Sequence, residues 1–222
     1  MLCVYGNKAN IISNKWKHDP TLRNTGGHTL AMIAKGKVGK YWRHDPTLSD
    51  PEGNTVAMIA LGDVDDNWKH DPTLSNLEGN TVAMLASGYV NDYWKHDPIL
   101  SNLKGNTVAM IARGGMKRYW VHDSMLSNSD GDTVAMLIAR RSGKDIPKLW
   151  QHSPTLSNSE GNTVAMLALG RVDDYWKHDS TLSNLGGNTV AMLALGKVDD
   201  YWKHDPTLTN KKGKRVCDLI KL

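Results

Sequence analysis

Phenylalanine is absent from this chain of 222 residues, and cysteine occurs only twice. Cys3 and Cys217 lie near opposite ends of the sequence, so in an extended fold they are too far apart for a disulfide. We therefore expect free thiols, as in a reducing compartment. No apolar run approaches the roughly 20 residues that a membrane-spanning helix requires.

The N-terminal segment also lacks a secretory signal, because residues 1–14 show no basic stretch followed by a long apolar core. We expect a cytoplasmic protein, and leave open a secreted effector exported by another kind of signal. The charge is close to balanced, with 27 basic and 23 acidic residues and a net charge of +4. Such a balance does not require a nucleic-acid partner.

Tryptophan recurs every 26 residues, with a single spacing of 30. The eight positions are Trp16, Trp42, Trp68, Trp94, Trp120, Trp150, Trp176 and Trp202. A fixed period of this size is typical of a solenoid, in which each repeat buries its apolar face against the next. We predict one repeat domain over 1–222, with an N-terminal cap at 1–15, repeats at 16–209 and a C-terminal cap at 210–222.

Each repeat contains two segments that look helical. In the repeat that begins at Trp68, Thr81 is a good N-cap for a first helix that Gly88 ends. A second helix is predicted over 89–96, and Pro98 ends it. The polar stretch 97–106 then forms a turn or extended connector. Neither helix exceeds about two turns, so stacking between repeats must supply the stability.

Two parts of the array depart from the pattern. The terminal repeats are degenerate: Cys3 begins a shortened core motif, and Asp218 replaces a core methionine, which requires a face open to water. The repeat between Met136 and Trp150 is four residues longer than its neighbours. There we expect the first helix to gain about one turn, and Pro147 to open the second helix.

The Gly-x-Thr core, the glycine after the first helix and the polar connector together resemble the ankyrin repeat. The chain departs from the ankyrin pattern in its shorter period, in Val82 at the motif proline and in Met84 at the motif histidine. The resemblance implies an all-α, ankyrin-like solenoid of about seven repeats with degenerate terminal caps. A leucine-rich repeat is the alternative, but the connectors lack its ladder of paired leucines.

Two residue columns recur in every repeat, and both are interpreted as structural. The Trp-x-His element places eight histidines in register, but repeats roughly 10 Å apart cannot share one metal ion. The histidines and the indole N–H groups are therefore expected to bond backbone atoms, and the tryptophan rings to fill the core. A methionine column is likewise assigned to the core: Met32, Met58, Met84, Met110, Met136, Met166 and Met192. No metal, cofactor or catalytic residue is predicted, and we expect no enzyme.

The positions that vary between repeats lie around the glycine between the two helices, and the middle of the chain is basic there. Residues 104–148 hold eight basic and four acidic residues. Their net charge of +4 equals that of the whole chain. We expect a monomeric protein–protein interaction scaffold that binds an acidic protein surface through these residues. A nucleic acid or another polyanion is the alternative partner. The candidate contacts are Arg113, Lys117, Arg118, Arg140, Arg141, Lys144 and Lys148, with Tyr89 and Met116 as apolar contacts.

Overall fold

The computed structural model describes residues 17–143 and 145–220. The chain divides into two compact units, one ending at residue 103 and the other beginning at residue 104. The sequence prediction of a single domain stays a prediction. The N-terminal cap at 1–15 and the thiol of Cys3 lie outside the described residues, whereas Cys217 is a free, exposed thiol.

The described residues are helical and form no β-strand. In the first unit, α-helices alternate with 3₁₀-helices: α1 Leu30–Ile33, η3 Lys40–Trp42, α2 Val56–Ile59, η4 Asp66–Trp68, α3 Val82–Leu85 and η5 Asp92–Trp94. The second unit continues in the same way: α4 Val108–Ile111, η6 Arg118–Trp120, α5 Val134–Ala139, η7 Lys148–Trp150, α6 Val164–Leu167, η8 Asp174–Trp176, α7 Val190–Leu193, η9 Asp200–Trp202 and α8 Val216–Ile220.

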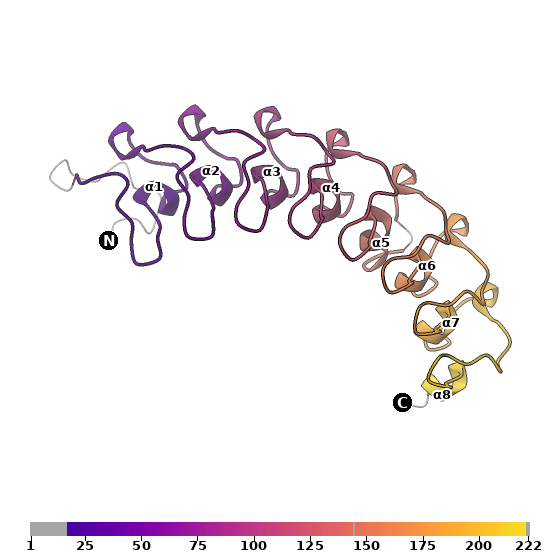
Figure 1. The fold of residues 1–222 in the computed structure, drawn as a ribbon. Helices are drawn as coiled ribbons and strands as arrows, with labels where there is room; N and C mark the ends of the chain where they lie inside the picture. The colour runs from indigo at the N-terminus through magenta and orange to yellow at the C-terminus, as the bar shows by residue number, and fades with distance from the viewer. Residues whose placement is uncertain (1–16, 144, 221–222) are drawn as a thin grey trace. The chain divides into compact units, whose positions relative to one another are not determined.

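Neighbouring α-helices pack against each other in chain order within each unit (Figure 1). In the first unit α2 contacts α1 and α3, and in the second unit consecutive helices from α4 to α8 contact one another. The prediction of an all-α repeat is therefore confirmed. None of the helices within residues 17–143 and 145–220 has the length and apolar character needed to span a bilayer.

The first helix begins and ends as predicted in the six repeats that contain α1 to α4, α6 and α7. In α3, the hydroxyl oxygen of Thr81 accepts a hydrogen bond from the N–H of Met84 at 3.3 Å, which satisfies one free donor of the first turn. The chain then turns through Ser87 and Gly88, both at positive φ. At the equivalent Gly62, a Cβ atom would lie 3.0 Å from Trp94 Cδ1, so packing as well as backbone conformation selects glycine.

The second helix was predicted too long. Instead of residues 89–96, only Asp92–Trp94 are helical, and they form a single 3₁₀ turn. Asn91 is its N-cap and accepts a hydrogen bond from the N–H of Tyr93. The length of the first helix in the long repeat was also predicted too long. Helix α5 has six residues against four in its neighbours, which is about half a turn more instead of a full turn. Pro147 does precede the second element, as the N-cap of η7.

Tryptophan rings fill the core, and several indole N–H groups bond to the repeat before, although the buried Nε1 of Trp150 has no hydrogen-bond partner among the described residues. Seven of them lie among the described residues, and their side chains are 0–4% exposed. The indole N–H of Trp68 donates to the carbonyl oxygen of Gly36 at 3.0 Å, and Trp94 and Trp202 make the same bond to Gly62 and Gly170. The predicted methionine column is confirmed as core too, since every member is at most 2% exposed.

The recurring histidines connect the two ends of each repeat. In the repeat that begins with α5, Thr133 Oγ1 lies 2.9 Å from His152 Nε2, and His152 Nδ1 lies 3.0 Å from the carbonyl oxygen of Ser153. A carbonyl oxygen can only accept, so Nδ1 carries the proton and Nε2 accepts from the threonine hydroxyl. The same hydroxyl oxygen caps α5 by accepting from the N–H of Met136. These bonds confirm the structural interpretation of the Trp-x-His element.

We expect the free energy of unfolding to fall when the pH is lowered from about 7.5 to about 5.5. Burial lowers the pKa of His96 and of His152 below the ordinary 6.5. Below about pH 6.5 the unfolded chain therefore binds more protons than the folded chain, and stability is lost on the acid side. Urea unfolding at both pH values measures the loss, and His96→Gln with His152→Gln should flatten it. An equal urea midpoint at both pH values would contradict this expectation.

Asparagine side chains form a ladder between consecutive connectors. Asn76 Oδ1 accepts the N–H groups of Glu78 and Asn80, and its Nδ2 donates to Asn54 Oδ1 at 2.8 Å. Equivalent rungs of this asparagine ladder join Asn102 to Asn80, Asn128 to Asn106, Asn158 to Asp132, Asn184 to Asn162 and Asn210 to Asn188. The Ser-Asn pairs thus form turns, as their composition predicts, and also hold neighbouring repeats together.

The C-terminal half-repeat has an open face, as the sequence predicts. Helix α8 contains no buried residue. Asp218, which stands where other repeats bury methionine, is partly exposed and forms an ion pair with Arg215 at 3.1 Å. A carboxylate is tolerated there because water and a guanidinium replace the apolar neighbours of the methionine column.

Candidate functional site

Six of the candidate basic residues lie at the turn between the two helices of consecutive repeats in the second unit, and all six are exposed. Three belong to the α4–η6 repeat: Arg113, Lys117 and Arg118. The other three belong to the α5–η7 repeat: Arg140, Arg141 and Lys148. Together these six residues are called the basic edge. Lys144 lies outside the described residues.

The two turns that carry the basic edge pack against each other. A Cβ atom on Gly114 would lie 2.9 Å from both Ile138 Cδ1 and Trp150 Nε1. Gly114 follows Arg113 directly, Ile138 lies two residues before Arg140, and Trp150 ends η7. The close approach at Gly114 therefore packs the turn of the α4–η6 repeat, with Arg113, directly against the α5–η7 repeat, which carries Arg140, Arg141 and Lys148.

The charge at this edge is reversed relative to four other repeats, and η3 also begins with a base, Lys40, but keeps Arg43 at the lysine position. Four repeats begin their 3₁₀-helix with an aspartate that is ion-paired at 2.5–2.8 Å to the lysine three residues later: Asp66–Lys69, Asp92–Lys95, Asp174–Lys177 and Asp200–Lys203. In η6 and η7 the aspartate positions hold Arg118 and Lys148, and the lysine positions hold Val121 and Gln151. Both members of the local ion pair have changed, which leaves an excess of positive charge.

The 3₁₀-helices η6 and η7 have no side-chain cap, in common with η3, η8 and η9, whereas η4 and η5 are capped. Asp65 accepts a hydrogen bond from the N–H of Asn67 and caps η4, but Lys117 and Pro147, at the equivalent positions, make no side-chain cap bond. Cations near a helix N-terminus oppose its dipole. Arg118 and Lys148 therefore oppose the dipole of the 3₁₀-helices that they begin, whereas an aspartate at that position favours it.

Few residues of the basic edge form an ion pair among the described residues. Arg140 is paired with Asp132 at 2.8 Å, and Asp132 also accepts from Asn158 within the asparagine ladder. No ion pair is found for Arg113, Arg118, Arg141 or Lys148 within residues 17–143 and 145–220. In the first unit, two basic residues of the α1–η3 repeat pair with acids of the next repeat, Lys37–Asp63 at 3.8 Å and Arg43–Asp65 at 3.1 Å, while Lys35 and Lys40 have no ion pair among the described residues.

The two apolar candidates lie in different units and differ in exposure. Tyr89 is 70% exposed but belongs to the unit that ends at residue 103. Met116 is partly buried and packs against the core cluster that contains Ile146 and Trp150. Its side chain therefore supports the turn, and the role of both residues as apolar contacts stays a prediction.

Sequence reasoning also passed over a polar cluster in the first unit, formed by His28, Asp50 and Glu52. A signal was present, because His28 stands at the Gly-Asn-Thr asparagine and Asp50 at the Ser-Asn asparagine of other repeats. His28 is also the one histidine of the nine that lies outside the Trp-x-His elements. No protein-family model matches the chain, and no similar sequence is found among curated proteins.

Proposed function

We propose that this chain is a protein-binding repeat module, and that the basic edge of the second unit binds an acidic surface of a partner protein. The observation that carries the proposal is the paired loss of aspartate and lysine in η6 and η7, where basic residues remain without the local ion pair of other repeats. Exposed charges of one sign set the orientation and the association rate of a complex.

The order of elements supports a relationship with ankyrin repeats, which we include in the proposal. Each repeat has a Gly-x-Thr start, a helix capped by the threonine, a glycine turn, a second helical element and a polar connector. The second element is one 3₁₀ turn, much shorter than an ankyrin helix. The turn between the two elements is therefore more exposed to a partner than a long second helix would leave it.

Charge reversal tests the proposal. We expect a chain with Arg113, Arg118, Arg141 and Lys148 changed to glutamate to lose a partner that the native chain captures from nuclease-treated lysate, with affinity lower by about tenfold or more. Arg140 is left in place because its loss would leave the buried Asp132 without its charged partner. The captured protein is identified, and its affinity for both chains is then measured in solution.

A matched control changes the same net charge elsewhere. Lys35, Lys197, Lys211 and Lys212 are exposed, and changing them to glutamate should leave capture unchanged. Equal loss in the control would mean that net charge, and not the basic edge, controls binding. Capture that disappears with nuclease treatment alone, together with a steep dependence on salt, would favour a nucleic acid as partner.

A further inference from the structure

The first described rung of the asparagine ladder has a different chemistry from the others. The rungs from Asn54–Asn76 onward pair an amide donor with an oxygen acceptor. Here the two positions hold His28 and Asp50, whose Nε2 and Oδ2 atoms are 3.5 Å apart. Both members have changed together, as they would if they served one purpose.

Asp50 is held in a fixed orientation. Its Oδ1 accepts the backbone N–H groups of Glu52 at 3.0 Å and Asn54 at 2.7 Å. Its Oδ2 has only long contacts, at 3.3 Å from Asn54 Nδ2 and at 3.5 Å from His28 Nε2. The side chain is 3% exposed, so this oxygen is a buried anionic acceptor without a short bond.

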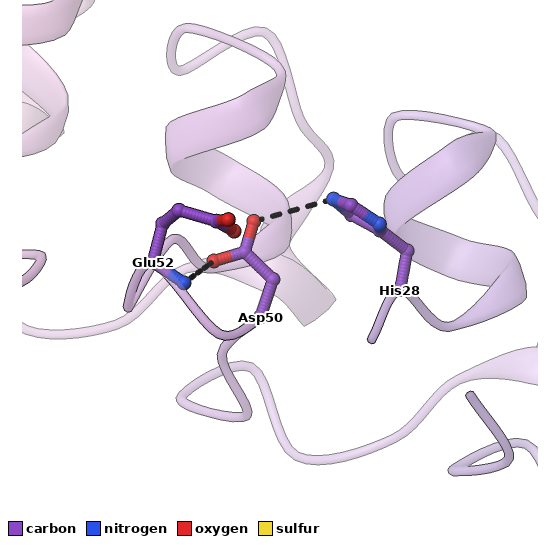
Figure 2. A group of neighbouring side chains, drawn as sticks. All are labelled: His28, Asp50 and Glu52. Atoms are coloured by element: carbon purple, nitrogen blue, oxygen red, sulfur yellow. Dashed lines mark hydrogen bonds and ion pairs between the residues drawn. The ribbon is translucent and has the colours of Figure 1, made fainter. Parts of the chain in front are cut away.

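The third member of the cluster is Glu52, which is exposed and two residues beyond Asp50. Its carboxylate lies beside that of Asp50, and the ring of His28 points toward the Asp50 carboxylate (Figure 2). One ligand atom from each of the three side chains lies within 4.8 Å of the other two. Two carboxylates this close repel each other unless a positive charge lies between them.

We propose that His28, Asp50 and Glu52 bind one divalent transition-metal ion of the Zn²⁺ type, a ligand that the sequence alone does not predict. The ligand atoms are His28 Nε2, Asp50 Oδ2 and one carboxylate oxygen of Glu52. Zinc bonds these atoms at about 2.1 Å in a tetrahedron, whose ligand atoms are then about 3.4 Å apart. The 3.5 Å between His28 and Asp50 fits that edge.

The surroundings match what a metal site requires. The two backbone N–H groups on Oδ1 orient the Asp50 carboxylate, as partners behind a ligand do in metal sites. The imidazole selects zinc-like ions over Mg²⁺ and Ca²⁺, which prefer oxygen ligands. The described Trp-x-His histidines do not compete, because Nε2 of each that pairs with threonine already accepts a hydroxyl proton.

Titration with Zn²⁺ by calorimetry tests the site, with Cys3 and Cys217 changed to serine in every chain so that thiols do not bind the metal. We expect one ion per chain and an unfolding midpoint raised by a few degrees at saturation. Glu52→Gln should weaken binding about tenfold or more. Glu78→Gln, the same change one repeat later beside an ordinary asparagine rung, should leave it unaltered.

The decisive variant restores the usual rung. His28→Asn with Asp50→Asn recreates the Asn–Asn pair of other repeats, so it should fold and lose saturable zinc binding. Zinc binding by this double variant as tight as in the parent chain would overturn the proposal. The absence of zinc binding in the parent chain would also overturn it. Equal binding of Mg²⁺ would overturn it too, because the imidazole should favour zinc.

Discussion

Replacing Trp68 by alanine should lower the free energy of unfolding by about 3–5 kcal/mol, the range for a buried aromatic side chain removed from a core. The ring is fully buried, and the edge of the His44 ring packs against it with centroids 5.0 Å apart. Its N–H donates to Gly36 across the repeat boundary, so the substitution also removes one of the two donors to that carbonyl oxygen, the other being the N–H of Val38. Urea unfolding followed by circular dichroism measures the change.

Two further variants separate the causes of that loss. Trp68→Phe retains a ring and removes the N–H donor, so it should cost less than the alanine variant. Leu77→Ala removes a side chain that is 70% exposed, and it should change stability by less than about 0.5 kcal/mol. A Trp68→Ala chain as stable as the Leu77→Ala chain would show that the tryptophan does not join the repeats.

Most of the repeat could be predicted from the sequence, because period, capping and turn residues are local signals. Thr81 and Gly88 mark the two ends of α3, and the fixed tryptophan spacing locates the core. The length of the second element could not be predicted locally. Val90 is buried before the N-cap Asn91, and after Trp94 the chain must extend so that His96 reaches Thr81. Tertiary bonds 15 residues apart therefore end the helix at one turn.

The candidate site was likewise predictable only where the signal is local in the sequence. The excess of positive charge between 104 and 148 is visible in the sequence, but the pairing of Arg140 with the buried Asp132 depends on folding. The contact between His28 and Asp50 could not be predicted from the sequence either. Each replaces an asparagine that other repeats have at that position. Only the stacking of connectors shows that these two positions, 22 residues apart, contact each other.

Thr133→Val should lower the free energy of unfolding by about 2–4 kcal/mol, although valine has nearly the same shape as threonine. One hydroxyl group serves two buried partners: it accepts from the N–H of Met136 at the start of α5 and donates to His152 Nε2. Valine leaves both partners unsatisfied in a site that excludes water. Thr155→Val is the matched control, because Thr155 is exposed and its hydroxyl contacts only Ser153 among the described residues.

A double-mutant cycle assigns the loss to the bond between Thr133 and His152. Once valine has removed the hydroxyl, His152 no longer receives a hydrogen bond, so His152→Ala should cost less in that background than in the native chain. We expect the difference to be about 1–2 kcal/mol, as for residues in direct contact. Additive effects of the two substitutions would mean that the histidine contributes through its other contacts, the hydrogen bond to the carbonyl oxygen of Ser153 and the packing on Trp176, whose ring centroid lies 5.0 Å from its own.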